Sequence, residues 1–344
     1  MAIPRIRRID ASVARWYHCT TRCVRRALLL DEGTFDRKAW IENRIEELAQ
    51  IVALAVGGFT VMTNHLHVLL RLDPKVAEGW SDEEVARRWG RLFPPRDKFR
   101  QPVPISEAWV QDRLNDLAWV ARTRERLQNI SWFMKCLKEP LSRLANREEK
   151  VRGAFFESRF RSVAILDDES LLAVATYIDL NPVAAGIAAV PESSEHTSIK
   201  TRVEHVAANG QIAQLEAAQQ GSVAGSRAAA AVEESLWLCP VEDRRMLDSS
   251  REGMLEGFSL GSYLLLVDYT GRIFRDGKAT ISAELAGIFD RLGGSAESWR
   301  TRLEKLRAGR LFGRFFAASR DRLQKLAAGL GMRSVWNLAG CPVR

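Results

Sequence analysis

Cysteine is scarce in this chain of 344 residues, and long apolar runs are missing. The five cysteines form no CxxC pair and follow no regular spacing, which argues against a disulfide framework or a cysteine zinc site and fits a reducing cytoplasm. No apolar run approaches the length of a membrane span, and the opening MAIPRIRRID lacks the apolar stretch of a signal peptide. We therefore expect a cytoplasmic protein without a membrane partner.

Acidic residues are outnumbered, so the chain carries a net charge of +8. The excess is uneven: residues 1–190 have a net charge of +5, residues 191–290 of −6, and residues 291–344 of +9. A basic chain is compatible with a nucleic-acid partner but does not establish one.

The order of elements predicts an α+β fold. Residues 14–24 alternate and are rich in aromatic and β-branched side chains, as is typical of a strand. We expect a helix over 35–56, a strand or hairpin over 57–72, a small helix and a proline-rich loop inserted over 74–108, a long helix over 116–148, a strand over 153–166 and a helix over 167–186. At this length two domains are expected, and an alanine-rich stretch over 201–235 indicates a linker.

Two of the five histidines, His65 and His67, stand two residues apart in the apolar segment TNHLHVLL. Side chains alternate along a strand, so both imidazoles share one face. They are candidate ligands of one divalent metal, but the pair taken alone favours two hydrogen-bonded sheet histidines. Further ligands would have to come from elsewhere in the chain.

The segment ATYIDLNPVAAG holds one of only four tyrosines, Tyr177. On a helix, Asn181 would share its face. A tyrosine hydroxyl beside a metal-polarised phosphodiester can attack phosphorus and expel a 3′-hydroxyl, whereas a half-buried core aromatic is the structural alternative. Because Asn181 precedes Pro182, the helix is expected to end near it.

Three motifs in this order, TNHLHVLL, GAFFESRFRSVAIL and TYIDLNPVAAG, resemble those of the single-tyrosine HUH transposases. The similarity is greatest to the branch associated with repetitive extragenic palindromes (REP). The opening WYHCTTRCVRR is similar to the first strand of that family, and the resemblance covers roughly residues 15–200.

The resemblance implies a ferredoxin-like antiparallel sheet with flanking helices. It implies Mg²⁺ or Mn²⁺ held by His65 and His67, with Asn181 at the position of the third ligand. Tyr177 would form a transient 5′-phosphotyrosine with single-stranded or hairpin DNA. On this basis, residues 1–200 are expected to form the catalytic domain and residues 236–344 a helical, basic region. The oligomeric state, monomer or homodimer, stays open.

The chain departs from the family pattern in three places. The segment between the histidine and basic strands is long, Ala184 replaces an arginine common after the NPV, and about 150 residues follow the catalytic helix. The C-terminal residues Phe312, Phe316, Leu323, Leu326 and Leu330 could bury against residues 259–274, in a DNA-binding module or a packed helical domain.

Five arginines are candidates for phosphate contacts, which position DNA without reading its sequence: Arg22, Arg25, Arg26, Arg159 and Arg161. Four aromatic residues could stack on unpaired bases, with core packing expected for at least two of them: Trp132, Phe155, Phe156 and Phe160.

Two functions remain at this point. The first is a tyrosine transposase or single-strand DNA endonuclease, and the second is a non-catalytic, domesticated DNA-binding protein on the same fold. The joint presence of His65, His67, Tyr177 and Asn181 favours the first. A metal hydrolase acting on small substrates would need carboxylate ligands, and none cluster near the histidines in sequence.

Overall fold

The computed structural model describes residues 9–188, 190–211, 231, 233–246 and 251–273, together with three two-residue strands farther along the chain. The helices and strands are β1 (Trp16–Arg22), η2 (Val24–Arg26), α1 (Arg37–Ile51), β2 (Leu54–Val61), β3 (His65–Leu72), α2 (Pro74–Glu78), α3 (Asp82–Leu92), α4 (Glu107–Leu114), α5 (Leu117–Leu127), α6 (Ile130–Glu148), β4 (Arg161–Ile165), α7 (Asp168–Asp179), α8 (Asn181–Ala184), η3 (Pro191–Ser193), α9 (Ser198–Ala208), β5 (Glu242–Asp243), β6 (Leu255–Glu256), α12 (Leu260–Ile273), β7 (Phe316–Ala317), β8 (Val335–Trp336) and β9 (Pro342–Val343).

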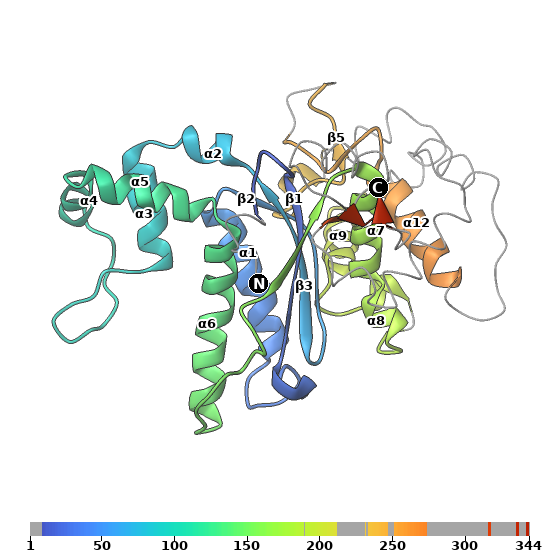
Figure 1. Ribbon diagram of the computed structural model, residues 1–344, viewed down its shortest axis with the longest axis horizontal. Coiled ribbons are helices and arrows are strands. Elements are labelled where there is room, and N and C mark those ends of the chain that lie inside the picture. Colours follow the sequence, from blue (N-terminus) through green and yellow to red (C-terminus); the bar gives the residue numbers. More distant parts are fainter. Residues whose placement is uncertain are drawn as a thin grey trace.

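Four antiparallel strands form the centre of the molecule in the order β2-β3-β1-β4, and the short β7 adds a parallel pairing to β4. With α1 between β1 and β2, and α6 between β3 and β4, this is the ferredoxin-like arrangement expected from the sequence. Figure 1 shows α1 and α6 on one side of the sheet and α7, α9 and α12 on the other. The helices α2 to α5 fill the long insert and extend away from the sheet beyond α6.

The strand alternation divides the core into two parts. One face of β1 and β3 carries Tyr17, Cys19, Leu66 and Val68, which pack with apolar side chains of α1 and α6. The other face carries Leu69, which packs with β4 and α7 in a separate apolar cluster. The histidines belong to this second face, since His67 and Leu69 are two residues apart on β3.

Three expected boundaries were wrong. The first helix ends at Ile51, and the chain turns into β2 already at Leu54, where β-branched and aromatic residues begin to alternate. The long helix over 116–148 is two helices, because Asn129 caps a new one by accepting hydrogen bonds from the amides of Ser131 and Trp132. Only Arg161–Ile165 of the basic segment is a strand, and residues 153–160 form a connection.

A register shift in β2 brings a helix against the histidine face. The shift lies between Val56 and Gly58. A Cβ on Gly57 would come within 2.6 Å of the Trp16 ring, so only glycine allows this close approach. The Phe59 amide donates a hydrogen bond to Ser198 Oγ at the start of α9 (2.9 Å). Residue 200, the expected end of the first domain, therefore lies inside α9, and α9 packs against the same sheet.

Residues after the expected linker also contact this sheet. Leu236 and Leu238 belong to the core beside α1, and the amide of Cys239 donates to the carbonyl of Val56 (2.8 Å). The division into domains stays a prediction, and most of the 201–235 stretch lies outside the described residues, as do the side chains of Phe312, Phe316, Leu323, Leu326 and Leu330. No helix in the described part of the chain is long and apolar enough to cross a membrane.

Candidate active site

The histidine end of the second sheet face gathers side chains from three neighbouring segments. In the ladder between β1 and β3, Arg22 lies opposite His65 and Thr20 opposite His67. The ring of His65 lies edge-on to that of His67, with centroids 5.0 Å apart. The strand alternation thus places both imidazoles on one face, as expected from their spacing.

Tyr177 reaches this face from α7. Its ring lies edge-on to His67, with centroids 5.5 Å apart. The Asn181 side chain lies near both the Tyr177 hydroxyl and the His65 ring, and it acts to lower the pKa of Tyr177 and to raise that of His65. The structure therefore brings together the four residues His65, His67, Tyr177 and Asn181, which are up to 116 positions apart in the chain.

The expected helix break before Pro182 is present and does not remove Asn181 from the site. Helix α7 ends at Asp179, and α8 begins at Asn181. Because Leu180 keeps an αR conformation, the chain continues in nearly the same direction. The amide of the Asn181 side chain donates to the carbonyl of Tyr177 at 3.4 Å, which holds Asn181 one turn below the tyrosine.

His18 on β1 belongs to the same cluster and was not among the sequence candidates. Its Nε2 lies 2.8 Å from Nδ1 of His67, and the two rings stack with centroids 5.0 Å apart. The Thr20 hydroxyl lies 3.3 Å from the same His67 nitrogen. The alternation of β1 gave His18 and Thr20 a common face, but only the pairing register of β1 with β3 shows that this face meets His67.

Asn64 was also missed, although it directly precedes the histidine strand. Its Oδ1 lies 2.7 Å from Nδ1 of His65, and its Nδ2 donates to the carbonyl of Arg26 at 2.9 Å. One side chain thus orients a histidine and fixes the basic turn η2 beside it. Residues Arg25 and Arg26 in that turn are exposed and adopt left-handed backbone conformations.

All three histidines at this end are held neutral. Burial lowers the pKa of His18 to about 3, and burial together with the charge of Arg22 lowers the pKa of His65 to about 4. Burial, the neighbouring histidines and Arg22 put the pKa of His67 well below its ordinary value. Neutral imidazoles are the form that binds metals.

Burial raises the pKa of the Tyr177 hydroxyl, and the hydrogen bond with Asn181 and the charge of Arg22 only partly oppose this. The tyrosine is therefore protonated near neutral pH. To act as a nucleophile, it would have to pass its proton to another group as it attacks.

His65, His67 and Asn181 bring two imidazole rings and one amide group to the same end of the sheet. The Asn64 Oδ1 can only accept a hydrogen bond, so Nδ1 of His65 donates to it and Nε2 of His65 carries the lone pair. Nδ1 of His67 is paired with Nε2 of His18. Two imidazoles bound to one ion at a metal–nitrogen distance of about 2.1 Å have ring centroids roughly 5 Å apart. Among the described residues, no group of three or more His, Cys, Asp or Glu side chains is arranged to hold a metal.

The candidate DNA-binding arginines do not all lie together. Arg22 faces the histidines, Arg25 and Arg26 follow it in the basic turn, and Arg161 is opposite Thr20 on β4. Arg159, in contrast, lines a cavity beside α6, on the other side of the sheet. Of the four aromatic candidates, Phe155, Phe156 and Phe160 are buried in the core, whereas Trp132 stays partly exposed.

The hydroxyls of two other tyrosines form hydrogen bonds away from this cluster. Tyr17 is buried on the opposite sheet face, where its hydroxyl donates to the carbonyl of Asp10 at 2.9 Å. Tyr263 is buried against α7 and donates to Asp179 at 2.6 Å. The side chain of Tyr269 lies outside the described residues.

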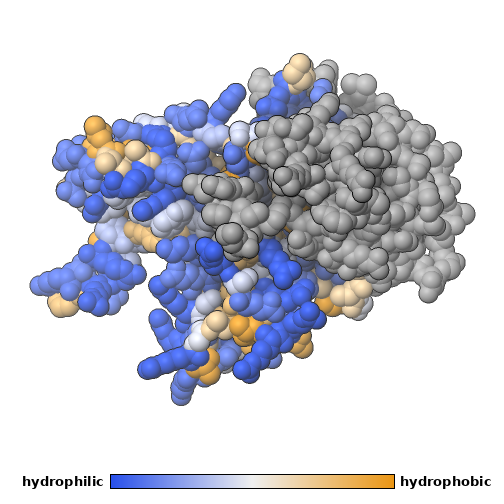
Figure 2. Space-filling view, in the orientation of Figure 1, coloured by the Kyte–Doolittle hydropathy of each residue, from blue (hydrophilic) through white to orange (hydrophobic). Residues whose placement is uncertain are grey.

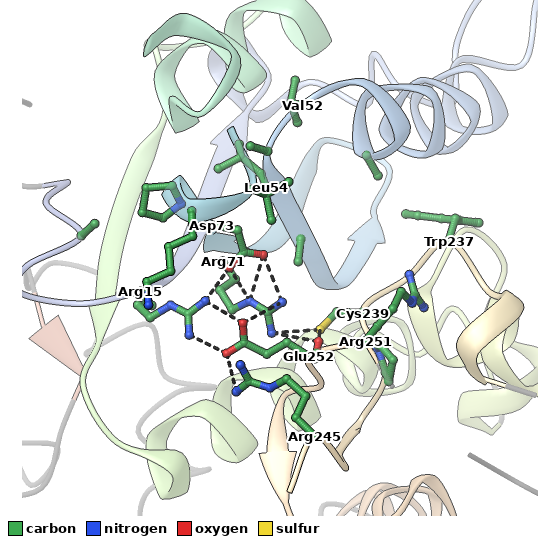
Figure 3. A pocket seen from close by; sticks show the side chains of 18 residues that line it. Arg15, Val52, Leu54, Arg71, Asp73, Trp237, Cys239, Arg245, Arg251 and Glu252 are labelled. Atoms are coloured by element: carbon green, nitrogen blue, oxygen red, sulfur yellow. Dashed lines mark hydrogen bonds and ion pairs between the residues drawn. The ribbon is translucent and has the colours of Figure 1, made fainter. Parts of the chain in front are cut away.

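The far end of the same face carries a different polar cluster, shown in Figure 3. Arg71 donates to both carboxylate oxygens of Asp73 and to the carbonyl of Gly253 (2.7 Å), and Arg15 bridges Asp73 and Glu252. These charges border a cavity of about 660 Å³ and fasten residues 252–253 to the sheet. Arg15, Arg71 and Arg245 thus share two carboxylates, Asp73 and Glu252, at this end of the sheet.

No family model and no curated protein matches this chain. Among solved structures, the chain is similar to that of a REP-associated tyrosine transposase bound to a REP hairpin. The sequence identity is 13% and the TM-score 0.35, and the match covers 59% of this chain and 86% of the other.

Proposed function

We propose that this chain is a metal-dependent tyrosine transposase or single-strand DNA endonuclease. The observation that carries the proposal is the meeting of Tyr177 with His65, His67 and Asn181 in one cluster. A core tyrosine would need no such neighbours. The sequence motifs that resemble the HUH transposases supply three of the segments that meet here.

The cleavage step breaks one phosphodiester bond and forms another. The Tyr177 oxygen attacks the phosphorus, the bond from phosphorus to the 3′-oxygen breaks, and the products are a 5′-phosphotyrosine and a free 3′-hydroxyl. Rejoining is the reverse reaction with a 3′-hydroxyl as the nucleophile. No nucleotide triphosphate is consumed, because the energy of the broken bond is kept in the phosphotyrosine.

His65, His67 and Asn181 would hold a Mg²⁺ or Mn²⁺ ion, which when bound draws negative charge from the scissile phosphate. His18 and Asn64 keep the two ligand rings in fixed orientations. Asn181 lies near the side chains of both Tyr177 and His65 and donates to the Tyr177 carbonyl, so it would keep the nucleophile beside the ligand set. Arg22 places a positive charge beside both His65 and Tyr177.

The DNA substrate we propose is single-stranded or hairpin-bearing. The exposed arginines Arg25, Arg26 and Arg161 near the histidine end suit contacts with phosphates. Affinity should fall as salt rises, because each phosphate contact releases counterions. Equal or tighter binding to blunt duplex DNA of the same sequence would contradict this substrate.

The experiment is a search for covalent protein–DNA adducts on a denaturing gel. Labelled single strands carrying a hairpin are incubated with the protein and Mn²⁺ or Mg²⁺. We expect an adduct that depends on the metal and a released strand ending in a 3′-hydroxyl. His65→Ala and His67→Ala should each abolish the adduct, and EDTA should do the same. If cleavage were fully active in EDTA, the metal assignment would be wrong. Specific DNA binding without any adduct would favour a non-catalytic regulator.

A further inference from the structure

A second cavity lies on the side of the sheet away from the histidines. It has a volume of about 690 Å³ and is bounded by α6 and the connection that leads into β4. Helix α6 packs on the opposite sheet face from His65 and His67. Figure 2 shows an apolar patch ringed by hydrophilic side chains toward the lower end of the described surface, in the region of this connection. The cavity is within the range of sites that enclose a nucleotide-sized ligand, roughly 300–1,000 Å³.

The lining of this cavity is strongly basic. Four cationic side chains line it, and the single carboxylate among its lining residues, Glu139, is ion-paired with Arg143. Lys135 and Arg159 are exposed, and neither forms an ion pair with a carboxylate among the residues that the structure describes. The charge of the cavity is therefore complementary to an anion.

Lys138 shapes the cavity. It is buried, and its ammonium group donates to the carbonyls of Ser158 (2.7 Å) and Arg159 while it lies over the ring of Phe156. These bonds fix the connection against α6, so the backbone that carries Arg159 has a defined position. The site is thus built by internal contacts and is not an accidental gap between two elements.

Trp132 supplies a flat apolar wall. Its ring is held edge-on by Trp89 and Phe93 of the inserted helix α3, at centroid distances of 5.5 and 6.4 Å. Lys135 lies over the same ring at 4.4 Å and Arg126 at 4.7 Å. Lys135 lines the cavity, so its ammonium would move from the ring to an adjoining phosphate when a base stacks on Trp132.

We propose that this cavity binds an unpaired nucleotide of single-stranded DNA, with the base on Trp132 and flanking phosphates at Lys135 and Arg159. The choice of DNA rests on the proposed function, whereas the cavity and its charge do not depend on it. Arg159 precedes β4 by two residues, and Arg161 at the start of β4 lies opposite Thr20 on the histidine face. In the described part of the chain, β4 pairs with β7 only at Ala164 and Ile165. Among these residues the sheet edge at Arg161 is therefore unpaired, and a single strand of DNA could pass there from one face of the sheet to the other.

The inserted helices support the Trp132 side of the cavity. Helices α3 and α5 contact each other and position Trp89 against Trp119 (centroids 6.5 Å) as well as Trp132. The insert thereby braces the stacking wall from behind. A platform that is already rigid loses little side-chain entropy when a base stacks on it.

The test uses the full chain with Tyr177→Phe, so that covalent capture cannot contribute to apparent affinity. Binding of a fluorescein-labelled oligothymidine is followed by anisotropy while the salt concentration is varied. Lys135→Ala combined with Arg159→Ala removes two phosphate contacts and should lower the slope of log K against log salt by about 1.4. Arg147→Ala is the matched control, because Arg147 is exposed on α6 and does not line the cavity. It should leave the slope unchanged.

Trp132→Leu should weaken binding of the same oligonucleotide roughly tenfold, since base stacking on an aromatic ring is lost. A 5-iodouracil oligonucleotide should photo-cross-link to peptides within residues 131–160. An unchanged affinity and salt slope in the Lys135/Arg159 double variant would overturn the proposal. An equal loss for blunt duplex DNA would also overturn it, because the cavity would then act only through general charge.

The outcomes separate this inference from the proposed function. Suppose the parent chain forms the Tyr177 adduct, yet the double variant binds and cleaves as the parent does: the cavity proposal is then wrong and the function stands. Suppose instead that the parent forms no adduct, while the double variant loses affinity and salt slope. The cavity then binds single strands on a chain that does not cleave them.

Discussion

The two ends of β3 carry buried polar side chains on the same face, but they are built in opposite ways. At one end His65 and His67 are neutral and bonded to other neutral groups, Asn64 and His18. At the other end Arg71 is charged and fully engaged by Asp73 and the carbonyls of 252–253 (Figure 3). At the arginine end, ion pairs and hydrogen bonds hold residues 252–253 to the sheet, whereas at the histidine end neutral rings lie beside one positive charge, Arg22.

The largest effect is expected from breaking the arginine end. Arg71→Met leaves Asp73 buried with only Arg15 as its partner and removes the donors to residues 252–253. Removal of one partner from a buried ion pair costs about 3–5 kcal/mol of unfolding free energy, measured by urea denaturation. Cleavage per folded molecule should stay the same at low temperature. If the variant instead unfolds like the parent, the arginine end does not hold the fold.

As the pH is lowered, the histidine end should lose stability before the arginine end does. The pKa values of His18, His65 and His67 are lower in the folded chain than in the unfolded one. Below about pH 6.5 the unfolded state therefore binds more protons, and the free energy of unfolding decreases as the pH is lowered. Each histidine contributes up to about 1.4 kcal/mol per pH unit until its folded pKa is reached, about 4 for His65 and about 3 for His18.

The carboxylate at the arginine end titrates later. Burial acts to raise the pKa of Glu252, but the hydrogen bond from Arg15 and the charges of Arg71 and Arg245 outweigh it and put the pKa below its ordinary value. Between pH 6.5 and 4.5, only the histidine end should therefore weaken. Urea titrations in EDTA at several pH values check this, and His18→Gln should make the pH dependence shallower. A pH dependence that His18→Gln leaves unchanged would contradict the neutral-histidine account.

A smaller effect is expected at Asn64. Asn64→Ala removes the hydrogen bonds to His65 and to the carbonyl of Arg26, at a net cost of about 1–2 kcal/mol of unfolding free energy. Because His65 also loses its orienting partner, metal affinity should fall about 10–100-fold. Calorimetric titration with Mn²⁺ measures it. Asn146→Ala is a control for asparagine removal, since Asn146 donates to the carbonyl of Gly153 far from the histidines.

The smallest change is expected from Arg22→Ala, which alters the charge beside the histidines without disturbing the core. The charge of Arg22 lowers the pKa of both His65 and His67, so its removal should raise both. NMR titration of the histidine ring protons in EDTA measures whether these two pKa values rise. The variant should also weaken single-strand binding and lower its salt slope by about 0.7. Unchanged histidine pKa values would mean that Arg22 does not act on this site.

Much of the candidate site could be predicted from the sequence because its signals are local. The spacing of His65 and His67 sets a common strand face, and the pair Tyr177 and Asn181 lies within one helical turn. His18 and Asn64 were missed for a physical reason. Their roles depend on which residues pair across β1 and β3 and on how the turn before β3 folds, neither of which a single sequence encodes in a readable pattern.

Prediction of the fold from the sequence was limited in the same way, because only local patterns could be interpreted. The α+β order of strands and helices followed from alternation and helical spacing, and the structure confirms the ferredoxin-like sheet that the family resemblance implied. The contacts of Arg71 with residues 252–253, and of Leu238 with the sheet, join segments more than 150 positions apart. Such contacts have no local signature, so the ion-paired end of β3 could not be predicted.

The most direct test of the central claim is to map the covalent adduct. The protein is reacted with a labelled hairpin-bearing single strand and Mn²⁺, digested, and the nucleotide-bearing peptide is identified by mass spectrometry. We predict that the nucleotide is on Tyr177. Tyr177→Phe should bind DNA and metal as the parent does but form no adduct, while Tyr17→Phe should still form it. An adduct on another tyrosine, or one formed by Tyr177→Phe, would contradict the account.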